Sequence, residues 1–217
     1  MHAGGHAAHL SGVLLFGFPV PGGALPFHEV LKALHRWLSR NTIVYTVIGG
    51  VAVVRSGSSR TTGDIDLLVR QVEWNRLRET APDSEFCVGP DWAKHHESGT
   101  PVDLLFAGDD WELPFLLPDP EHVREWDPAV GAWFMRPAAL LELKAAVYLS
   151  KKADYGEATA AHDLADVTSL LTANPDLRDE ALLKTLHPSV QELLETTRQE
   201  VQRYRRKQPS NRSGGRS

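Results

Sequence analysis

The stretch over residues 45–69, YTVIGGVAVVRSGSSRTTGDIDLLV, constrains the fold more than any other part of the chain. Residues 43–48 are mostly β-branched and apolar, which predicts a short buried strand, and the pair Gly49 and Gly50 ends it. Residues 51–54 then favour the start of a helix. A strand, a tight glycine turn and a helix N-terminus leave backbone N–H groups free to hold an anion. The sequence therefore predicts an anion-binding turn at the glycine pair.

Two carboxylates, Asp64 and Asp66, open the strand-like run that follows, residues 64–70. Side chains at positions i and i+2 project from the same face of a strand, so the two acids point together while Ile65 and Leu67 face the core. Neighbouring carboxylates repel each other and raise each other's pKa unless a cation lies between them. Mg²⁺ is commonly held by carboxylates and substrate phosphates. The simpler alternative is that both acids are ordinary turn and surface residues.

Asp103 supplies a third carboxylate in another strand-like run, residues 102–106. An acid flanked by Val102 and Leu104 is costly to bury unless it is paired or coordinated. Three carboxylates on neighbouring strands suit two metal ions about 3.5–4 Å apart, which stabilise the attacking and leaving oxygens of an in-line displacement. We therefore predict a site for two Mg²⁺ ions, with Mn²⁺ as an alternative ion. The competing interpretation makes Asp103 an exposed residue at the start of a strand.

The order of a glycine pair, a basic residue, D-I-D and a later single Asp resembles the nucleotidyltransferase superfamily of DNA polymerase β. Within it, the chain is most similar to the AbiEii-type nucleotidyltransferases, a family that includes toxins of bacterial toxin–antitoxin systems. That family follows the glycine pair with R-x-[ST]-x-D-[IL]-D, and residues 60–66 read RTTGDID. It also has a Lys-bearing helix and then a (K/R)DxxD-like helix, to which Lys144 and residues 162–166 (HDLAD) correspond. The resemblance covers residues 43–171.

This resemblance implies an α+β fold: a small mixed β-sheet nucleotidyltransferase core with flanking helices, followed by a C-terminal helical bundle. The domain organisation that we predict is a disordered N-terminal extension (1–24), the nucleotidyltransferase core (25–136), a helical domain (137–206) and a basic disordered tail (207–217). Apolar periodicity predicts strands over 43–48, 64–70, 85–88, 102–107 and 133–135, and helices over 26–39, 72–80, 137–152, 157–173, 178–186 and 189–206.

The same resemblance implies Mg²⁺-dependent transfer of a nucleoside monophosphate from an NTP to an acceptor hydroxyl. The acceptor would be RNA, tRNA included, or a protein, and a toxin would have a cognate antitoxin as partner. The nucleotide phosphates would lie on Gly49 and Gly50, and Arg60 and Lys144 would neutralise their charge. Two alternatives stay open: an antibiotic nucleotidyltransferase of the aminoglycoside or lincosamide kind, and a catalytically silent module that binds a nucleotide or RNA.

Asp163 and Asp166 lie three residues apart and therefore on one face of a predicted helix. They either orient Lys144 or Arg60, or belong to a solvated surface. The sequence leaves both interpretations open.

Charge is distributed unevenly along the chain. The net charge is −5, yet residues 203–217 carry six basic side chains and no acid, which leaves 17 basic and 28 acidic side chains, a net charge of −11, in residues 1–202. Such an acidic body is not typical of a general nucleic-acid binder, and any RNA contact must be local. The basic end either follows a nucleic-acid backbone or is a solvated tail.

The single cysteine, Cys87, excludes an internal disulfide framework and fits a reducing cytoplasm. It lies in a strand-like run, where we expect a small core residue. No apolar stretch approaches the roughly 20 residues that span a bilayer, so we predict no membrane association. Together these features predict a cytoplasmic protein.

Overall fold

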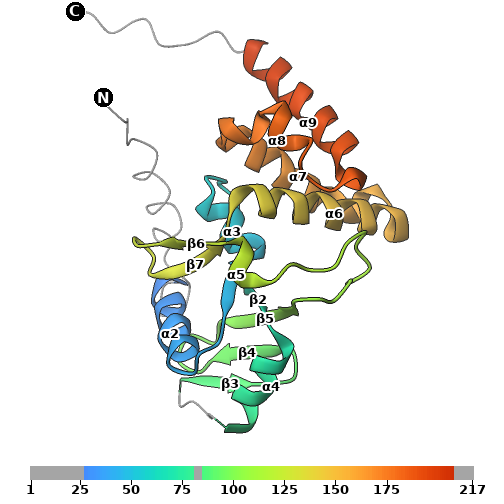
Figure 1. Cartoon of the computed structure of the whole chain (residues 1–217). Coiled ribbons are helices and arrows are strands. Elements are labelled where there is room, and N and C mark those ends of the chain that lie inside the picture. The colour runs from blue at the N-terminus through green and yellow to red at the C-terminus, as the bar shows by residue number, and fades with distance from the viewer. Residues whose placement is uncertain (1–26, 81–84, 208–217) are drawn as a thin grey trace, which may run out of the picture.

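The computed structural model describes residues 27–80 and 85–207 of the chain. The predicted N-terminal extension (1–24) and the tail from residue 208 onward lie outside these residues. Within them the chain forms a mixed β-sheet with helices on both faces, and the helices of the C-terminal part stack together beyond one of these faces (Figure 1). The predicted α+β fold class is confirmed.

The sheet contains seven strands in the described part of the chain, in the order β3-β4-β5-β2-β1-β7-β6. β2 runs parallel to β5 and β1 runs parallel to β7, while the other neighbours are antiparallel. The strands are β1 (Tyr45–Ile48), β2 (Ile65–Val69), β3 (Phe86–Val88), β4 (Trp92–His95), β5 (Pro101–Phe106), β6 (Arg124–Asp127) and β7 (Ala132–Met135). All five predicted strands are present, although β2 begins at Ile65, one residue after Asp64.

Two strands, β4 and β6, were not predicted. β4 buries only alternate residues, and β6 has the polar sequence REWD, so neither forms an apolar run that stands out in the sequence. The Cys87 prediction is wrong for a related reason. β3 is short, and Phe86 faces the core while Cys87 is exposed on the other side of the strand.

The described helical elements are α2 (Phe27–Arg40), α3 (Gly49–Arg55), α4 (Gln71–Thr80), α5 (Pro120–Val123), α6 (Pro137–Tyr155), α7 (Glu157–Ala173), the 3-10 helix η1 (Pro175–Arg178), α8 (Glu180–Leu183) and α9 (Pro188–Lys207). The single helix predicted over 178–186 is instead divided between η1 and α8. Asp179 lies in extended backbone between them and accepts a hydrogen bond from the Ala181 N–H, so a new helix starts there. Among the described helices, none combines the length and apolar character needed to cross a bilayer.

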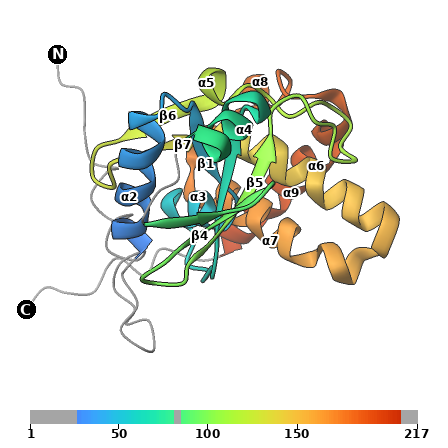
Figure 2. The ribbon, with the colours of Figure 1, turned by 90° about the horizontal axis from the view of Figure 1, so that it is seen from below.

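Side chains of β2 point alternately to the two faces of the sheet, and both faces are covered, since Leu68 on the face of Asp66 is buried as well. Ile65, Leu67 and Val69 are buried on one face, as the strand period predicts. Helix α2 lies on the opposite side of the strands from α6 and α7 (Figure 2). Asp66, at an alternate position, projects from the other face of the sheet, and this face carries the candidate site.

An aromatic cluster joins α2, α4 and β3. The Trp37 ring stacks on Phe86 with centroids 4.9 Å apart, and it meets Trp74 edge-on at 5.9 Å. Trp37 and Trp74 are each 1% exposed. The cluster therefore fixes two helices and an edge strand against the core.

We expect Trp37→Ala to lower the free energy of unfolding by about 3–5 kcal/mol, because it removes a buried aromatic side chain and leaves a cavity. Trp37→Phe should cost much less. It keeps most of the ring contact, and the indole N–H that it removes is buried without a hydrogen-bond partner. Urea unfolding followed by circular dichroism measures both changes. Equal losses for the two variants would contradict the packing role given to this ring.

Candidate functional site

Strand register brings the three predicted carboxylates together. Asp66 lies directly opposite Asp103 in the parallel β2–β5 pair, and Asp64 precedes Asp66 by two residues on the same face. One oxygen from each of the three side chains lies within 4.8 Å of the others. Asp64 and Asp66 are half-buried, whereas Asp103 is exposed, because Val102 and Leu104 take the buried face of β5. The free-energy cost of removing a carboxylate from water therefore falls on the two acids at the start of β2 and not on the acid of β5.

The glycine pair packs directly against this cluster. Ile48 lies opposite Asp66 in the antiparallel β1–β2 pair, so the chain turns into α3 beside that acid. Gly49 has φ +62°, and a Cβ at this position would overlap the Asp66 carboxylate. The Gly50 backbone N–H donates a hydrogen bond to Asp66. Glycine is thus required at position 49 both for backbone conformation and for space.

Thr62 is a site residue that the sequence reasoning missed. Its hydroxyl donates to the Asp64 carboxylate, with Oγ1 and Oδ1 2.8 Å apart. The same side chain lies against Gly50, where an added Cβ would overlap Oγ1. A hydroxyl residue two positions before an acid is the signal that could have identified it, because Thr side chains often hydrogen-bond locally.

The two predicted cations share one buried carboxylate. Arg60 Nη1 lies 2.6 Å from both oxygens of Asp166, and Lys144 Nζ lies 2.9 Å from Asp166 Oδ2. Lys144 is also 3.4 Å from Asp163, which in turn is 2.8 Å from Lys151 Nζ. Asp163 and Asp166 are 5% and 2% exposed, so the interpretation of these acids as a solvated surface is wrong. Lys151 was not predicted.

The surroundings of Asp66 shift its pKa upward. Burial raises the pKa of the Asp66 carboxyl, and repulsion from Asp64 raises it further. Lys144 and the Gly50 N–H lower this pKa, and Asp103 adds a smaller upward shift. Burial, together with the neighbouring carboxylates, therefore disfavours the ionised form of Asp66. The donors of the cluster are all carboxylate oxygens, a set that fits a hard divalent ion such as Mg²⁺ or Mn²⁺.

The chain is similar to the crystal structure of an antigenic nucleotidyltransferase-like protein from Paracoccidioides brasiliensis, at 19% sequence identity and a TM-score of 0.45. The matched region covers 66% of this chain and 74% of that chain. No protein-family model matches the chain, and no curated protein matches it.

We expect Asp66→Asn to raise the Tm of the metal-free protein at pH 7.5. A carboxyl whose pKa is raised on folding stabilises the fold while protonated, and this contribution is lost as pH rises through the folded pKa. The difference between variant and wild type should therefore shrink toward pH 3, below the unfolded pKa. Thermal unfolding in EDTA across this range measures it.

The same titration has a metal arm. Mg²⁺ at about 100 times its Kd should raise the Tm of the wild type by about 5–10 °C, and the Asp66→Asn variant should respond much less. An equal response of both proteins to Mg²⁺ would show that Asp66 is not a ligand.

Asp166→Asn should lower the free energy of unfolding by about 3 kcal/mol, because Arg60 and Lys144 lose the buried anion that both contact. Asp176→Asn, at an exposed position in η1, is the matched control and should stay within about 0.5 kcal/mol of the wild type. Urea unfolding at low ionic strength compares the two. Similar values for both variants would mean that the Asp166 pairs contribute nothing to stability.

Proposed function

We propose that this protein is a Mg²⁺-dependent nucleotidyltransferase that moves a nucleoside monophosphate from an NTP to an acceptor hydroxyl. The observation that carries the proposal is the meeting of Asp64, Asp66 and Asp103 on one face of the sheet, beside a glycine turn and the half-buried ammonium of Lys144. Exposed acidic groups often lie close together without a ligand. Here, however, the half-buried Asp66 has a raised pKa and packs against Gly49, whose backbone conformation and lack of a Cβ no other residue could reproduce.

The proposed roles follow from position. Asp64 and Asp66 would hold both metal ions, and Asp103 would complete the acceptor side of the site, where its exposure leaves it accessible to an incoming hydroxyl. Bound Mg²⁺ would supply positive charge at the α-phosphate and at the oxygens of the displacement. The acceptor oxygen bonds to the α-phosphorus as the bond from that phosphorus to the bridging oxygen of the β-phosphate breaks. Pyrophosphate leaves, and the acceptor proton passes to Asp103.

Arg60 and Lys144 would neutralise the triphosphate. The Arg60 Nη2 atom lies 3.2 Å from the position that a Cβ would occupy on Gly50, so its guanidinium already borders the turn proposed to bind phosphate. Arginine has five N–H donors, and Nη1 alone contacts Asp166, which leaves further donors for phosphate oxygens. Asp163 and Asp166 would act as positioning residues that hold both cations at the edge of the site.

The resemblance to the AbiEii-type family supports an RNA or protein acceptor, a cytoplasmic location and, for a toxin, a cognate antitoxin. A silent regulatory module is the less economical reading. Three clustered carboxylates, one with a raised pKa, weaken the fold at neutral pH, so a module that had lost catalysis would gain stability by replacing one of them.

We expect the Asp64→Asn/Asp66→Asn double variant to lose at least about 100-fold in Mg²⁺-dependent pyrophosphate release, since it removes the charges proposed to hold the metal. Asp91→Asn, an exposed acid just before β4, is the matched control and should keep wild-type activity. The assay supplies each labelled NTP with total RNA, total protein or small hydroxyl compounds, and circular dichroism verifies folding. Undiminished release by the double variant would overturn the assignment. Wild-type protein that binds Mg·NTP by calorimetry without releasing pyrophosphate would favour the silent module.

A further inference from the structure

The connection between β5 and α5, residues 107–119, forms a loop that is held closed at its base, and we call it the β5–α5 loop. The Gly108 N–H donates to the Leu117 carbonyl at 2.9 Å. Just beyond, Arg70 pairs with both oxygens of Asp119 at 2.8 and 2.9 Å. The loop runs from the end of β5 to the C-terminal part of α6 and returns to α5 (Figure 1). Compact loops closed in this way often carry function.

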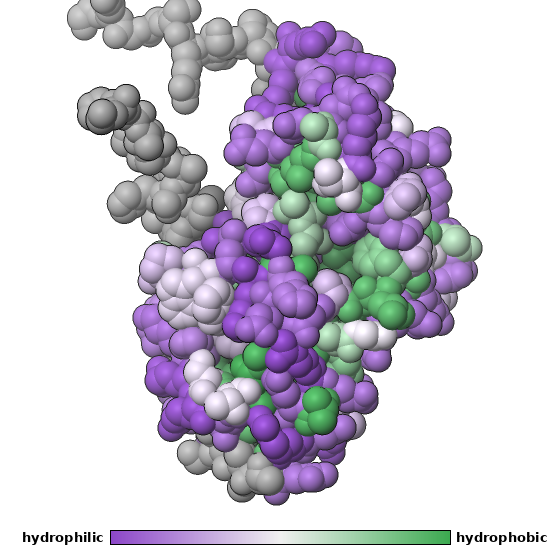
Figure 3. Space-filling view, viewed as in Figure 1, coloured by the Kyte–Doolittle hydropathy of each residue, from purple (hydrophilic) through white to green (hydrophobic). Residues whose placement is uncertain are grey.

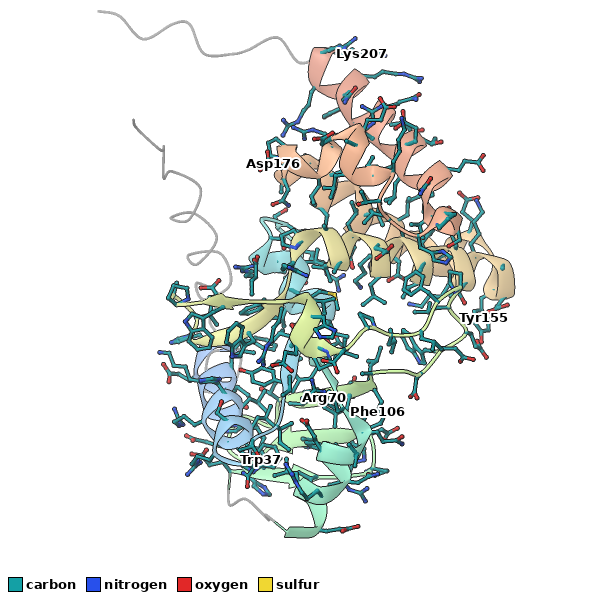
Figure 4. The ribbon with its side chains drawn as sticks, viewed as in Figure 1. Trp37, Arg70, Phe106, Tyr155, Asp176 and Lys207 are labelled. Carbon is teal, nitrogen blue, oxygen red and sulfur yellow. The ribbon has the colours of Figure 1, made fainter. Side chains whose placement is uncertain are left out.

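A hollow of about 350 Å³ lies between this loop and α6. The loop contributes Trp111 and Glu112 to its walls, and α6 contributes Lys151, Asp154 and Tyr155. A second hollow of about 410 Å³ adjoins it and shares Glu112, Asp154 and Tyr155. Figure 4 shows Tyr155 at the C-terminal end of α6, beside the returning loop. Each hollow falls within the size range of sites for small molecules.

The hollow lies on the helix face that also borders the carboxylate cluster. Lys144, Val147 and Lys151 are spaced by three and four residues, so they share one face of α6. Val147 and Lys151 line the hollow, and Lys151 and Lys144 contact the same carboxylate, Asp163. Lys144 and Lys151 are about 10 Å apart along the helix axis. A small molecule in the hollow is therefore within one molecular length of the site.

Strand β5 also connects the carboxylate cluster to this loop. The loop follows Phe106, and Asp103 lies three residues earlier, about 10 Å along the strand. The glycine turn lies on the other side of Asp66, after β1. β5, the strand that leads into the loop, thus lies on the side of β2 away from β1 and its glycine turn, which is the side from which an acceptor would approach.

The walls of the hollow are aromatic and anionic. Trp111 and Tyr155 are 52% and 68% exposed, unusually open for large aromatic side chains. Glu112 and Asp154 place carboxylates beside these rings. The positive charge of Lys151 is already paired with Asp163. Within residues 27–80 and 85–207, neither Glu112 nor Asp154 forms an ion pair. Aromatic faces next to such carboxylates attract organic cations, through cation–π contact and direct charge pairing.

The backbone of the β5–α5 loop is strained at two residues that line the hollow. Trp111 and Glu112 are consecutive residues with φ of +42° and +57°, the left-handed region that side chains other than glycine rarely occupy. Asp109 and Asp110 precede them and add two exposed acids to the same loop. Figure 3 shows apolar residues at the surface between this loop and α6, within a largely hydrophilic surround. A nucleic-acid backbone would meet repulsion here, whereas an amine-bearing molecule would not.

We propose that the hollow is the acceptor subsite of the transferase proposed above, on which this inference rests, and that it takes an amine-bearing hydroxyl compound of the amino-sugar or aminocyclitol class. The ammonium groups pair with Glu112 and Asp154, and the rings pack on Trp111 and Tyr155. A hydroxyl then reaches the α-phosphorus of the NTP. Its oxygen bonds to that phosphorus, pyrophosphate leaves and the hydroxyl proton passes to Asp103.

Calorimetry with kanamycin as the probe, in EDTA, tests the hollow without catalysis. We expect saturable binding to the wild type, and an affinity at least tenfold lower in Trp111→Ala and in Glu112→Gln/Asp154→Asn. Tyr204→Ala and Glu200→Gln, exposed positions on α9, are the matched controls and should bind as the wild type does. Neutral maltotriose should bind far more weakly than kanamycin. No kanamycin binding, or equal binding by all variants, would overturn the assignment.

A transfer assay then distinguishes a failure of the acceptor subsite from a failure of the proposed nucleotidyltransferase activity. Asp64→Asn/Asp66→Asn should still bind kanamycin but transfer nothing, which shows that the hollow is intact when the metal site is not. In the wild type we expect label from Mg·NTP on kanamycin, and Trp111→Ala should raise the KM for kanamycin at least tenfold while the KM for NTP stays unchanged. A raised KM for NTP alone would assign the hollow to the nucleobase and overturn the proposal, as would label on RNA but not on kanamycin. Kanamycin binding without pyrophosphate release for any NTP would overturn the transferase itself.

Discussion

The geometry of the site depends on two buried aspartates of α7 that carry three cations between them. Asp166 contacts Arg60 from the segment before β2 and Lys144 from α6, so one carboxylate joins three separate parts of the chain. A carboxylate that is 2% exposed is tolerated only with such partners. Because the pairs hold Lys144 in place, its charge stays near Asp66 and lowers the pKa of that acid. The same ion pairs therefore hold the helices together and set the charge near the carboxylate cluster.

Much of the fold could be predicted because strands with buried faces have a clear apolar pattern. β1, β2 and β5 were predicted from such patterns, and they are the strands that build the site. Elements with weak apolar patterns were not predicted. The buried residues of β4, Ala93 and His95, are not strongly apolar, so their alternation does not stand out. The break at Asp179 comes from a local helix cap inside a run that otherwise favours helix. Cys87 was misassigned because position in a strand does not say which face is buried when the strand lies at an edge.

The site was predictable as far as spacing along the chain determines position in space. The strand period places Asp64 and Asp66 on one face, but only the register of β2 against β5 sets Asp103 opposite Asp66. Helical spacing likewise puts Asp163 and Asp166 on one face without saying what lies in front of it. The contacts of Thr62 and Lys151, and the hollow beyond them, depend on how the loops and α6 pack. No pattern in the sequence carries that information.

Helix α6 gives the site a direction. Near its middle, Lys144 brings positive charge to the carboxylate cluster, which suits a triphosphate. Toward its C-terminus, Asp154 and the acids of the β5–α5 loop make the same side of the molecule anionic. An anionic substrate would therefore be favoured near the middle of α6, and a cationic substrate near its C-terminus. In the proposed reaction the nucleotide and a cationic acceptor would lie side by side along α6, with their reacting groups over Asp103. Two anionic substrates would compete for the same place near Lys144. The charge pattern thus supports the cationic acceptor proposed above over a nucleic acid.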